Sequence, residues 1–555
     1  MSHTHPTSSP TAAPAVLRIE NLSIRFGSGS EQRTVVSGLN LTVQAGESVA
    51  LVGESGSGKS VTARSLVGLN GQRAHIHADR FEIDGEDVRA YSERQWRAIR
   101  GRRIGFVLQD ALVSLDPLCR IGSLLGEVQR VQTTLSPRAI AERSAALLRS
   151  VGIADAERRL RQYPHQLSGG LRQRALIATA IAGEPSLLIA DEPTTALDVT
   201  TQKQILALIL ELQRSHNTAV LFITHDFGVV AEIADRIAVM NRGRLVEVGA
   251  REDILARPKE AYTRMLVSSV PGLAPQARQA PEGEPVLIVD GLEKTYAERG
   301  FFKAKRTVHA VRDVSFTLRK KEIVGIVGES GSGKSTLARC IARLIDPSAG
   351  SVRLDGAEIA TATKREFHPV RKRIQVVFQD PYRSLNARIR VGDSIVEGMR
   401  NFGVPEAEAR ARAVELLDIV GLGADTMERY PHQFSGGQRQ RICIARALAL
   451  RPDILIADEA VSALDVSVQA QVLELIEDIR TRTDTAVLFI THDLRVAAQI
   501  CNSIVVMKFG QIVEAGQAAD VLTRPQDEYT RQLLDAAPGR HWDFKRFRPA
   551  QATPH

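Results

Sequence analysis

Short apolar runs recur along this chain, and polar or glycine-rich residues follow them directly. The run at 48–52 precedes Gly53, and the run at 187–190 precedes Asp191. Runs of this length predict strands buried inside a sheet, and the stretch 60–68 predicts a helix directly after the first of them. The chain therefore predicts an α/β fold that carries polar groups at the ends of buried strands.

The whole series occurs twice. Residues 218–226 recur letter for letter as 485–493, and the apolar run before Asp191 returns before Asp458. The distance between matching positions changes little along the chain, which indicates a duplicated domain rather than a solenoid repeat. We expect a polar tail at 1–15, a first domain at 16–267, a Pro/Gly-rich linker at 268–285, a second domain at 286–537 and a basic-aromatic tail at 538–555.

Each copy contains the same loop, GESGSGKS, directly after a predicted strand. The loop fits G-x-x-x-x-G-K-[ST], in which backbone N–H groups surround phosphate oxygens, the lysine supplies a positive charge and the serine hydroxyl binds Mg²⁺. Two identical loops predict two nucleotide sites. The predicted nucleotide-binding residues are Gly53, Glu54, Ser55, Gly56, Ser57, Gly58, Lys59 and Ser60 in the first copy, and Gly328, Glu329, Ser330, Gly331, Ser332, Gly333, Lys334, Ser335 and Thr336 in the second.

Composition narrows the class of protein. The 555-residue chain has ordinary apolar and charged fractions, 43% and 25%, and no apolar run long enough to span a bilayer. Its N-terminus lacks the basic and apolar regions of a signal peptide. The four cysteines are far apart and predict small buried apolar residues rather than redox or metal ligands. We therefore expect a cytosolic protein without disulfides.

The net charge of +8 is compatible with nucleic acid, with an anionic membrane surface or with a solvated basic surface. Basic residues are interspersed with acidic ones in 138–161 and 406–415, so we expect a solvated surface and no nucleic-acid partner. The basic-aromatic segments 301–306 and 541–548 are the best candidates for lipid or partner contact.

A second motif follows in each copy, where residues 167–174 are LSGGLRQR and residues 434–441 are FSGGQRQR. A serine and two glycines at a helix start present bare N–H groups to an anion. With the two loops, this motif makes nearly the whole chain resemble the nucleotide-binding subunits of ABC transporters. The resemblance implies two tandem P-loop NTPase domains of the ABC type, each with a RecA-like α/β core, an antiparallel β subdomain and a helical signature subdomain.

The resemblance also implies that the two domains pair head to tail and sandwich two ATP molecules. The loop of Lys59 would face the signature residues of the second copy, and the loop of Lys334 would face those of the first. These signature residues are Ser168, Gly169 and Gly170 in the first copy, and Ser435, Gly436 and Gly437 in the second. Fusion of the halves would raise the effective concentration at which they meet.

The remaining roles also come from the resemblance. In the family, a glutamate polarises the attacking water, a histidine contacts the γ-phosphate and a glutamine lies near Mg²⁺ and the water. The implied catalytic residues are Glu192, Glu459, His225, His492, Gln109 and Gln379. The implied Mg²⁺ ligands are Ser60, Gln109, Asp191, Ser335, Gln379 and Asp458. Asp198 and Asp465 match the D-loop aspartates, and Phe26 and Tyr296 match the aromatic residue that stacks on adenine.

Two positions depart from the family pattern. Leu171 stands where the second copy has Gln438, and Ala460 stands where the first copy has Pro193. Neither change removes a charge or a phosphate donor. We therefore expect both sites to hydrolyse ATP, at rates that need not be equal.

The segments 109–118 and 379–388, and a Tyr-Thr-Arg sequence near the end of each domain, resemble the peptide/nickel importer branch. That branch implies two integral-membrane permease subunits, which dock beside the Q-loops, the segments that begin at Gln109 and Gln379. It also implies an extracytoplasmic solute-binding protein and a peripheral location at the cytoplasmic face of the inner membrane. Neither the linker nor the C-terminal tail contains a cysteine, so we expect no iron–sulfur cluster.

Several alternatives stay open. The solute is a peptide by default, but nickel, glutathione, modified peptides and some sugars are carried by similar systems. An exporter is possible because direction depends on the permease. The short Pro-rich linker argues against a ribosome-bound twin ATPase, and the absence of inserted coiled coils or zinc modules argues against a DNA-repair or chromosome ATPase.

Overall fold

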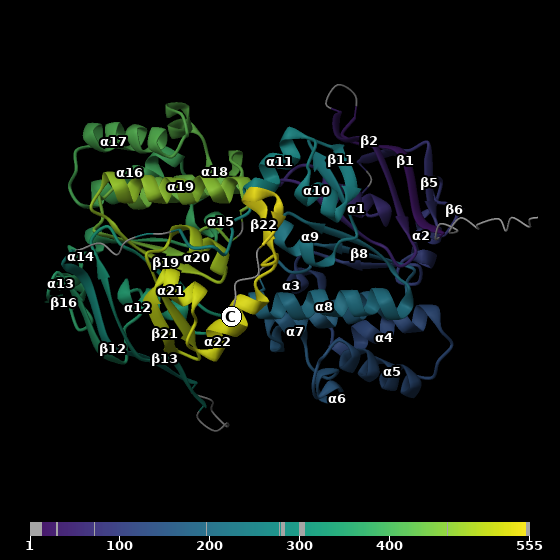
Figure 1. Cartoon of the computed structure of the whole chain (residues 1–555), viewed down its shortest axis with the longest axis horizontal. Helices are drawn as coiled ribbons and strands as arrows, with labels where there is room; N and C mark the ends of the chain where they lie inside the picture. The colour runs from purple at the N-terminus through teal and green to yellow at the C-terminus, as the bar shows by residue number, and fades with distance from the viewer. Residues whose placement is uncertain are drawn as a thin grey trace, which may run out of the picture. The chain divides into compact units, whose positions relative to one another are not determined.

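The chain divides into two compact units in the computed structural model (Figure 1). The structure describes residues 14–28, 32–71, 73–195, 197–276, 278, 283–298, 306–462 and 464–550. Unit 1 takes in residues up to 197, 201–268 and 546–549, and unit 2 takes in 198–200, 269–545 and the residues from 550 onward. Each unit contains a six-stranded sheet and an antiparallel sheet, so the predicted α/β class is confirmed in both.

The six-stranded sheet of unit 1 is built from the apolar runs. Strands β3 (Ser48–Val52), β8 (Leu187–Asp191) and β9 (Ala219–Thr224) are buried along their whole length. A parallel strand covered on both faces needs a continuous apolar sequence rather than an alternating one. The strand order is β11-β10-β3-β9-β8-β7, parallel except for β11, with outer strands β7 (Ile104–Val107), β10 (Arg236–Asn241) and β11 (Arg244–Ala250).

A second, antiparallel sheet packs against this one. Leu17, Ile24 and Val36 share a core with Val49 and Leu51 of the parallel sheet. The long strands alternate buried and exposed positions, as one covered face requires. The strands are β1 (Ala15–Phe26), β2 (Arg33–Gln44), β4 (Ala74–His77), β5 (Arg80–Ile83) and β6 (Glu86–Asp87).

A helical subdomain lies between β7 and β8, and its residues Leu125, Leu148 and Ile177 share one core with Ala190 and Val220 of the parallel sheet. Its helices are α3 (Ala111–Ser114), α4 (Ile121–Gln132), α5 (Pro137–Ser150), α6 (Ala156–Arg159) and α7 (Gly169–Ile181), with the 3-10 turn η2 (Pro164–Gln166). The other helices before residue 269 are α1 (Lys59–Leu66), α2 (Glu93–Ile99), α8 (Val199–His216), α9 (Phe227–Ile233), α10 (Arg251–Ala256) and α11 (Ala261–Ser268).

Unit 2 repeats this architecture. Its larger sheet has the order β17-β18-β19-β14-β20-β21, with β14 (Ile323–Val327), β17 (Ile374–Val377), β18 (Ile454–Asp458), β19 (Ala486–Thr491), β20 (Ser503–Lys508) and β21 (Gln511–Gln517). Its antiparallel sheet has the order β13-β12-β15-β16, with β12 (Pro285–Glu298), β13 (Arg306–Arg319), β15 (Ala349–Leu354) and β16 (Ala357–Glu358).

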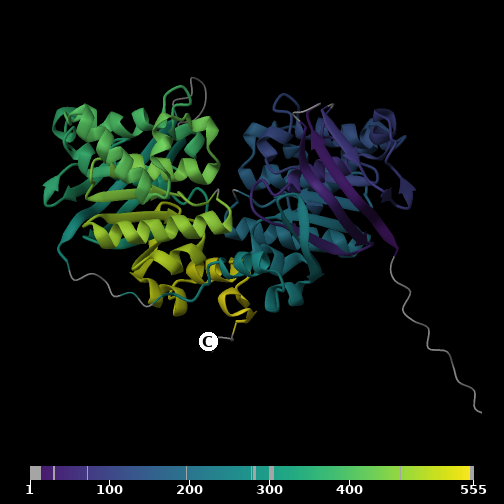
Figure 2. The same cartoon turned by 90° about the horizontal axis from the view of Figure 1, so that it is seen from above.

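The helices of unit 2 follow the same plan. Figure 1 shows α16 to α19 gathered on the side of the unit away from β12 and β13, and Figure 2 shows them from above in green. The helices of the unit are α12 (Lys334–Ile341), α13 (Lys364–Phe367), α14 (Val370–Arg373), α15 (Pro381–Ser384), α16 (Val391–Asn401), α17 (Glu406–Ile419), α18 (Gly436–Leu448), α19 (Val466–Arg482), α20 (Leu494–Ile500), α21 (Ala518–Thr523) and α22 (Glu528–Ala536), with 3-10 turns η3 (Ala424–Glu428) and η4 (Pro431–Gln433).

Part of the predicted linker is tied to unit 2. The Arg278 guanidinium donates to the Gln499 carbonyl at 3.1 Å and lies 2.8 Å from the Glu477 carboxylate. The backbone N–H of Gln276 donates to the Ala498 carbonyl at 3.2 Å. This stretch therefore follows the surface of unit 2 near the end of α20.

The predicted C-terminal tail also contains regular structure. It forms β22 (Trp542–Asp543), η5 (Phe544–Arg546) and β23 (Arg548–Pro549), and Phe544 is buried. Of the other basic-aromatic segment, residues 301–305 lie outside the described residues. Because Phe544 is buried, its ring is not available for the lipid or partner contact that the sequence had suggested. For the rest of 541–548 this contact stays a prediction.

Cys340, Cys443 and Cys501 are buried, as predicted. Cys119 is partly exposed, so the prediction of a buried residue is wrong at this position. Within the part of the chain that the structure describes, no helix combines the length and apolar character needed to cross a bilayer.

Candidate functional site

Four neighbouring parallel strands of unit 1 end in predicted site residues. The loop of Gly53–Ser60 follows β3, and His225 follows β9. Asp191 ends β8, Glu192 comes directly after it, and Gln109 follows β7. Because the carboxyl ends of parallel strands share one edge of the sheet, these side chains meet there. The sheet order in unit 2 places the corresponding residues in the same way.

The first loop has the geometry of a phosphate cradle. Gly53 has φ +153°, and a Cβ there would lie 2.2 Å from the Met240 carbonyl oxygen, so no other residue fits. Helix α1 begins at Lys59, and its first N–H groups therefore face the loop. Lys59 is only 5% exposed, and its Nζ donates to the carbonyls of Gly53 at 2.7 Å and Glu54 at 2.9 Å.

The second loop repeats this cradle. A Cβ on Gly328 would lie 2.3 Å from the Met507 carbonyl oxygen. The Lys334 Nζ donates to the carbonyls of Gly328 and Glu329, both at 2.7 Å. Burial lowers the pKa of Lys334. Both ammonium groups are thus held inside their own loops by neutral carbonyls.

A hydroxyl and a carboxylate meet beside each cradle. The Ser60 Oγ donates to Asp191 Oδ1 at 3.0 Å, and Ser335 Oγ donates to Asp458 Oδ1 at 3.0 Å. Burial raises the pKa of both aspartates, and the serine hydrogen bond only partly opposes this effect. A buried carboxylate whose pKa is raised by burial, next to a hydroxyl oxygen, fits Mg²⁺, which favours oxygen ligands and usually keeps phosphate oxygens in its shell.

The glutamate after β8 is the centre of a network. Glu192 has φ +48°, a region that residues with a Cβ rarely adopt, and its N–H donates to the Ile223 carbonyl at 2.8 Å. Gln109 Nε2 donates to Glu192 Oε2 at 2.7 Å, and His225 Nδ1 lies 3.0 Å from Glu192 Oε1. The bent backbone therefore directs the carboxylate at two other predicted catalytic residues, Gln109 and His225.

Glu192 and His225 shift the pKa values of each other toward the charged forms. Burial alone would raise the pKa of Glu192, but the hydrogen bond and charge of His225 outweigh it and lower that pKa. Burial alone would lower the pKa of His225, but Glu192 outweighs it and raises that pKa. Each group thus favours the charged form of the other.

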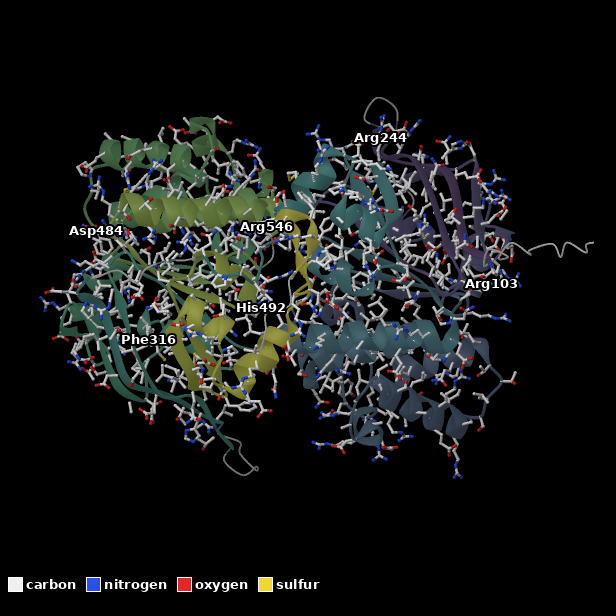
Figure 3. All side chains as sticks on the ribbon, viewed as in Figure 1. Arg103, Arg244, Phe316, Asp484, His492 and Arg546 are labelled. Carbon is white, nitrogen blue, oxygen red and sulfur yellow. The ribbon has the colours of Figure 1, made fainter. Side chains whose placement is uncertain are left out.

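Unit 2 repeats the network, but the distance between the histidine and the glutamate is longer. Gln379 Nε2 donates to Glu459 Oε2 at 2.7 Å, and His492 Nδ1 lies 3.4 Å from Glu459 Oε1. Glu459 also has a positive φ, +50°. His492 lies between β19 and α20 (Figure 3). The pKa directions are the same as in unit 1.

Two kinds of contact were not predicted from the sequence. Thr195 Oγ1 donates to Glu192 Oε2 at 3.1 Å, whereas its counterpart Ser462 donates to the backbone carbonyl of Glu459 at 3.0 Å. Tyr262, near the end of unit 1, contacts Glu54 of the phosphate loop. The Tyr-Thr-Arg repeat was a sequence signal for this tyrosine, but its spacing did not indicate a contact with the loop.

The signature motifs start helices α7 and α18. Ser435 N donates to Gln438 Oε1 at 3.0 Å and Gln438 N donates to Ser435 Oγ at 3.3 Å, which is a reciprocal capping box. In the first copy, Leu171 N donates to Ser168 Oγ at 3.4 Å, but leucine cannot return the bond. Ser168, Gly169 and Ser435 are exposed at these helix starts.

The remaining predicted residues lie apart from these networks. Phe26 is half-buried at the end of β1 against the core between the two sheets, and Tyr296 in β12 is 42% exposed. Asp465 caps α19 by accepting from Val468 N at 3.2 Å, and Asp198 directly precedes α8. The roles of all four with ATP stay predictions.

Residues 36–195 and 311–462 match the family described as ABC transporter. The chain belongs to the ABC transporter family. Residues 246–300 and 513–554 match the oligopeptide/dipeptide transporter C-terminal region. The duplicated cassettes of this ABC protein are thus each followed by the same branch-specific segment, as the sequence predicted.

The relatives of this ABC protein are similar over nearly their whole length. The peptidoglycan transport ATP-binding protein YejF of Agrobacterium fabrum is 43% identical, covering 95% of this chain and 97% of the relative. The glutathione import ATP-binding protein GsiA of Escherichia coli K12 is 44% identical, covering 96% and 91%. A solved dimeric ABC cassette with bound ADP and phosphate is 29% identical over 42% of this chain and 98% of that chain, with a TM-score of 0.38.

These matches confirm the predicted ATP-binding and ATP-hydrolysing subunit of an ABC transport system. ATPases of such systems act with membrane permease partners. The ribosome-bound and DNA-acting alternatives are not favoured.

Proposed function

We propose that the chain hydrolyses MgATP at both loops and thereby drives import of a peptide-like solute through a membrane permease. The observation that carries this proposal is the network in each unit, in which one glutamate carboxylate contacts a glutamine at 2.7 Å and a histidine at 3.0 or 3.4 Å. A carboxylate kept ionised and fixed on both sides is suited to accept a hydrogen bond from an attacking water.

The residues of the cradle act before this step. Lys59 and Lys334 exchange the loop carbonyls for phosphate oxygens, and the bare N–H groups of α1 and α12 bind the same anion. Bound Mg²⁺ would neutralise phosphate charge and would be held by Ser60 and Asp191, or by Ser335 and Asp458, with Gln109 and Gln379 nearby. In their charged forms, which Glu192 and Glu459 favour, His225 and His492 would stabilise negative charge that grows on the γ-phosphate.

We infer that each signature motif completes the ATP site of the other unit. The exposed helix starts at Ser168 and Ser435 are anion sites that the loop of their own unit does not require. Lys334→Ala should leave hydrolysis at the Lys59 loop only. In that background, Ser435→Arg should abolish the remaining activity and Ser168→Arg should preserve it; the reverse result would show that each signature serves its own unit.

The docking surfaces for two permease subunits lie beside the Q-loops in this proposal. Exposed apolar side chains follow both glutamines, namely Val113 and Leu118 at 80% and 85% exposure, and Tyr382 at 62%. Such side chains suit contact with another protein. The protein would act at the cytoplasmic face of the inner membrane, with an extracytoplasmic solute-binding protein reaching it only through the permease. We propose neither a nucleic-acid partner nor an iron–sulfur cluster.

The solute class rests on the branch. Both C-terminal regions match the oligopeptide/dipeptide type, and the similar proteins are named for glutathione import and peptidoglycan transport. Glutathione and the peptide stems of peptidoglycan both contain amide-linked amino acids. A short peptide or peptide conjugate is therefore the solute we propose.

The partners can be tested by affinity capture from detergent-solubilised membranes. The bait is the Glu192→Gln, Glu459→Gln variant with MgATP, which binds but does not hydrolyse the nucleotide. The Lys59→Ala, Lys334→Ala variant is the matched control. Two multi-span proteins retained by the bait and lost from the control support the proposal, while ribosomal or DNA-bound partners without an integral membrane protein contradict it.

The solute can be tested with the captured complex in proteoliposomes. Uptake of labelled di- and tripeptides and of glutathione is measured with and without MgATP and with added solute-binding protein. ATP-dependent uptake of one of these supports the proposed class. Uptake of nickel or a sugar alone would contradict the peptide-like solute while leaving the importer in place.

A further inference from the structure

The last helix of each unit reaches back to the phosphate loop. Tyr262, in α11, accepts a hydrogen bond from the backbone N–H of Glu54 at 3.2 Å, and its own hydroxyl lies 3.3 Å from Glu54 Oε2, to which it donates. One phenol thus binds both the backbone and the side chain of the second loop residue.

Unit 2 contains the same contact independently. The backbone N–H of Glu329 donates to the Tyr529 hydroxyl at 3.0 Å, and Tyr529 lies in α22. The Tyr529 side chain is buried, and the Lys508 Nζ lies 4.5 Å from the centre of its ring. Burial raises the pKa of Tyr529 to about 12, so its hydroxyl keeps the proton at any physiological pH.

The contacted residue links the tyrosine to the lysine of the phosphate loop. The Glu54 carbonyl accepts from Lys59 Nζ at 2.9 Å, and the Glu329 carbonyl accepts from Lys334 Nζ at 2.7 Å. In each unit a continuous chain of hydrogen bonds therefore runs from the C-terminal helix, through the backbone of the second loop residue, to the ammonium group that meets the phosphates.

We propose that Tyr262 and Tyr529 are positioning residues of the two ATP sites. Each hydroxyl holds the start of its loop in the open cradle before ATP arrives, so that ATP does not have to order the loop and lysine itself. A loop ordered in advance loses less conformational entropy on binding, and the gain appears as tighter binding. Both tyrosines lie in the segments that match the oligopeptide/dipeptide transporter C-terminal region. This role concerns ATP binding and does not depend on the solute or the permease.

A purely structural role is the competing explanation, in which the tyrosines only anchor their helices. Tyr→Phe distinguishes the two, because the ring stays and the hydroxyl alone is lost. Anchoring of the helix would appear as a change in thermal unfolding. Positioning of the loop would appear as weaker ATP binding with unchanged turnover at saturation.

The test uses Tyr262→Phe, Tyr529→Phe and the double variant in the full chain. ATP dissociation constants are measured by calorimetry in the Glu192→Gln, Glu459→Gln background, and KM and kcat are measured without those changes. We expect a rise in Kd and KM of about three- to tenfold at each altered site, with kcat within about twofold. Tyr91→Phe is the matched control, since it removes a hydroxyl that donates to Glu86 away from the loops.

Three results would overturn the proposal. One is an ATP affinity of the double variant within twofold of the parent and equal to that of Tyr91→Phe. The second is a fall in kcat at unchanged KM, which would place the hydroxyls in the chemical step. The third is an affinity loss that appears only together with a marked drop in unfolding temperature. The control for this result is Glu54→Gln, which leaves the backbone bond to Tyr262 in place and should not show that drop.

Discussion

His225 Nδ1 lies 3.0 Å from Glu192 Oε1, and the equivalent distance from His492 to Glu459 is 3.4 Å. Burial disfavours the charged forms of the histidine and the glutamate, and in both units each residue favours the charged form of the other. The pair therefore behaves as one charged unit, and a change in either residue alters the protonation of the other.

The pKa of His225 should fall in the Glu192→Gln variant. The carboxylate raises this pKa, while burial opposes it and remains after the substitution. In the parent protein, the stabilisation from the charged pair is complete below the unfolded-state pKa of about 6.5 and is lost as pH rises through the raised folded-state value. The variant should lack this loss of stability.

The measurement is a ¹³C NMR titration of histidine-labelled protein, with signals assigned from His225→Gln and His492→Gln. His492 is the internal control, since it belongs to the other unit and keeps Glu459. A His225 pKa that stays at the parent value in Glu192→Gln would show that another group sets it.

Thr195→Ala should lower kcat more than Ser462→Ala. Thr195 donates to the carboxylate of Glu192, while Ser462 donates to the backbone carbonyl of Glu459. In the Lys334→Ala background, in which only the Lys59 loop hydrolyses ATP, loss of this bond should reduce kcat by about three- to tenfold without a matching rise in KM. In the Lys59→Ala background, Ser462→Ala should stay within about twofold of its own parent.

Steady-state ATPase assays decide this comparison, and Thr195→Ser is the rescue variant because it keeps the hydroxyl. If Thr195→Ser is as slow as Thr195→Ala, the threonine methyl rather than the hydrogen bond is what counts. Equal effects of Thr195→Ala and Ser462→Ala would remove the proposed difference between the two glutamates.

The sequence predicted the parts of the site in which residue type and position are closely linked. Gly53 is required by its φ and by the nearby Met240 carbonyl, and buried parallel strands require apolar runs such as 48–52 and 187–190. These constraints act locally or follow from the parallel sheet, and they fix the residue types at these positions. A sequence motif therefore predicts them.

The contacts that were not predicted join residues far apart in the chain. Tyr262 and Glu54 are separated by 208 positions, and no periodicity relates them. The stretch around Arg278 has the composition of a free linker, yet the Arg278 guanidinium lies 2.8 Å from the Glu477 carboxylate. Composition reports local backbone preference, whereas such contacts depend on which surfaces the fold brings together.

Gln438→Leu should loosen the start of α18. Gln438 completes the capping box with Ser435, which Leu171 cannot do for Ser168. Loss of one of the two cap bonds should cost about 0.5–1 kcal/mol locally. Hydrogen exchange of the peptide around 431–440 should therefore become faster in the variant, and exchange around 164–173 in Leu171→Gln should become slower.

The two substitutions are controls for each other, because they exchange the residues of the two copies. Peptides from the antiparallel sheets should be unchanged in both variants. Faster exchange throughout unit 2 in Gln438→Leu would instead indicate global destabilisation, and unchanged exchange at both helix starts would show that the reciprocal bond adds nothing.

Asp191→Asn should stabilise the nucleotide-free protein and weaken its response to MgATP, while the second site, which keeps Asp458, still responds. Burial raises the pKa of Asp191, so the ionised carboxylate opposes folding at neutral pH, and asparagine still accepts from Ser60. The stability penalty shrinks as pH falls through the raised folded-state pKa and is gone below the unfolded-state pKa of about 3.9. The advantage of the variant should therefore shrink on acidification. Ligand binding to the folded state raises the unfolding temperature of the parent, and the variant should lose the part that Mg²⁺ contributes. Thermal unfolding of both proteins between pH 5 and 8, with and without MgATP, checks this prediction. Asp84→Asn is the control, because Asp84 also accepts from a serine hydroxyl, that of Ser186 at 2.7 Å, but belongs to no predicted ATP or metal site. An Asp191→Asn protein that is less stable at every pH would mean that the carboxylate makes a favourable interaction that outweighs its burial.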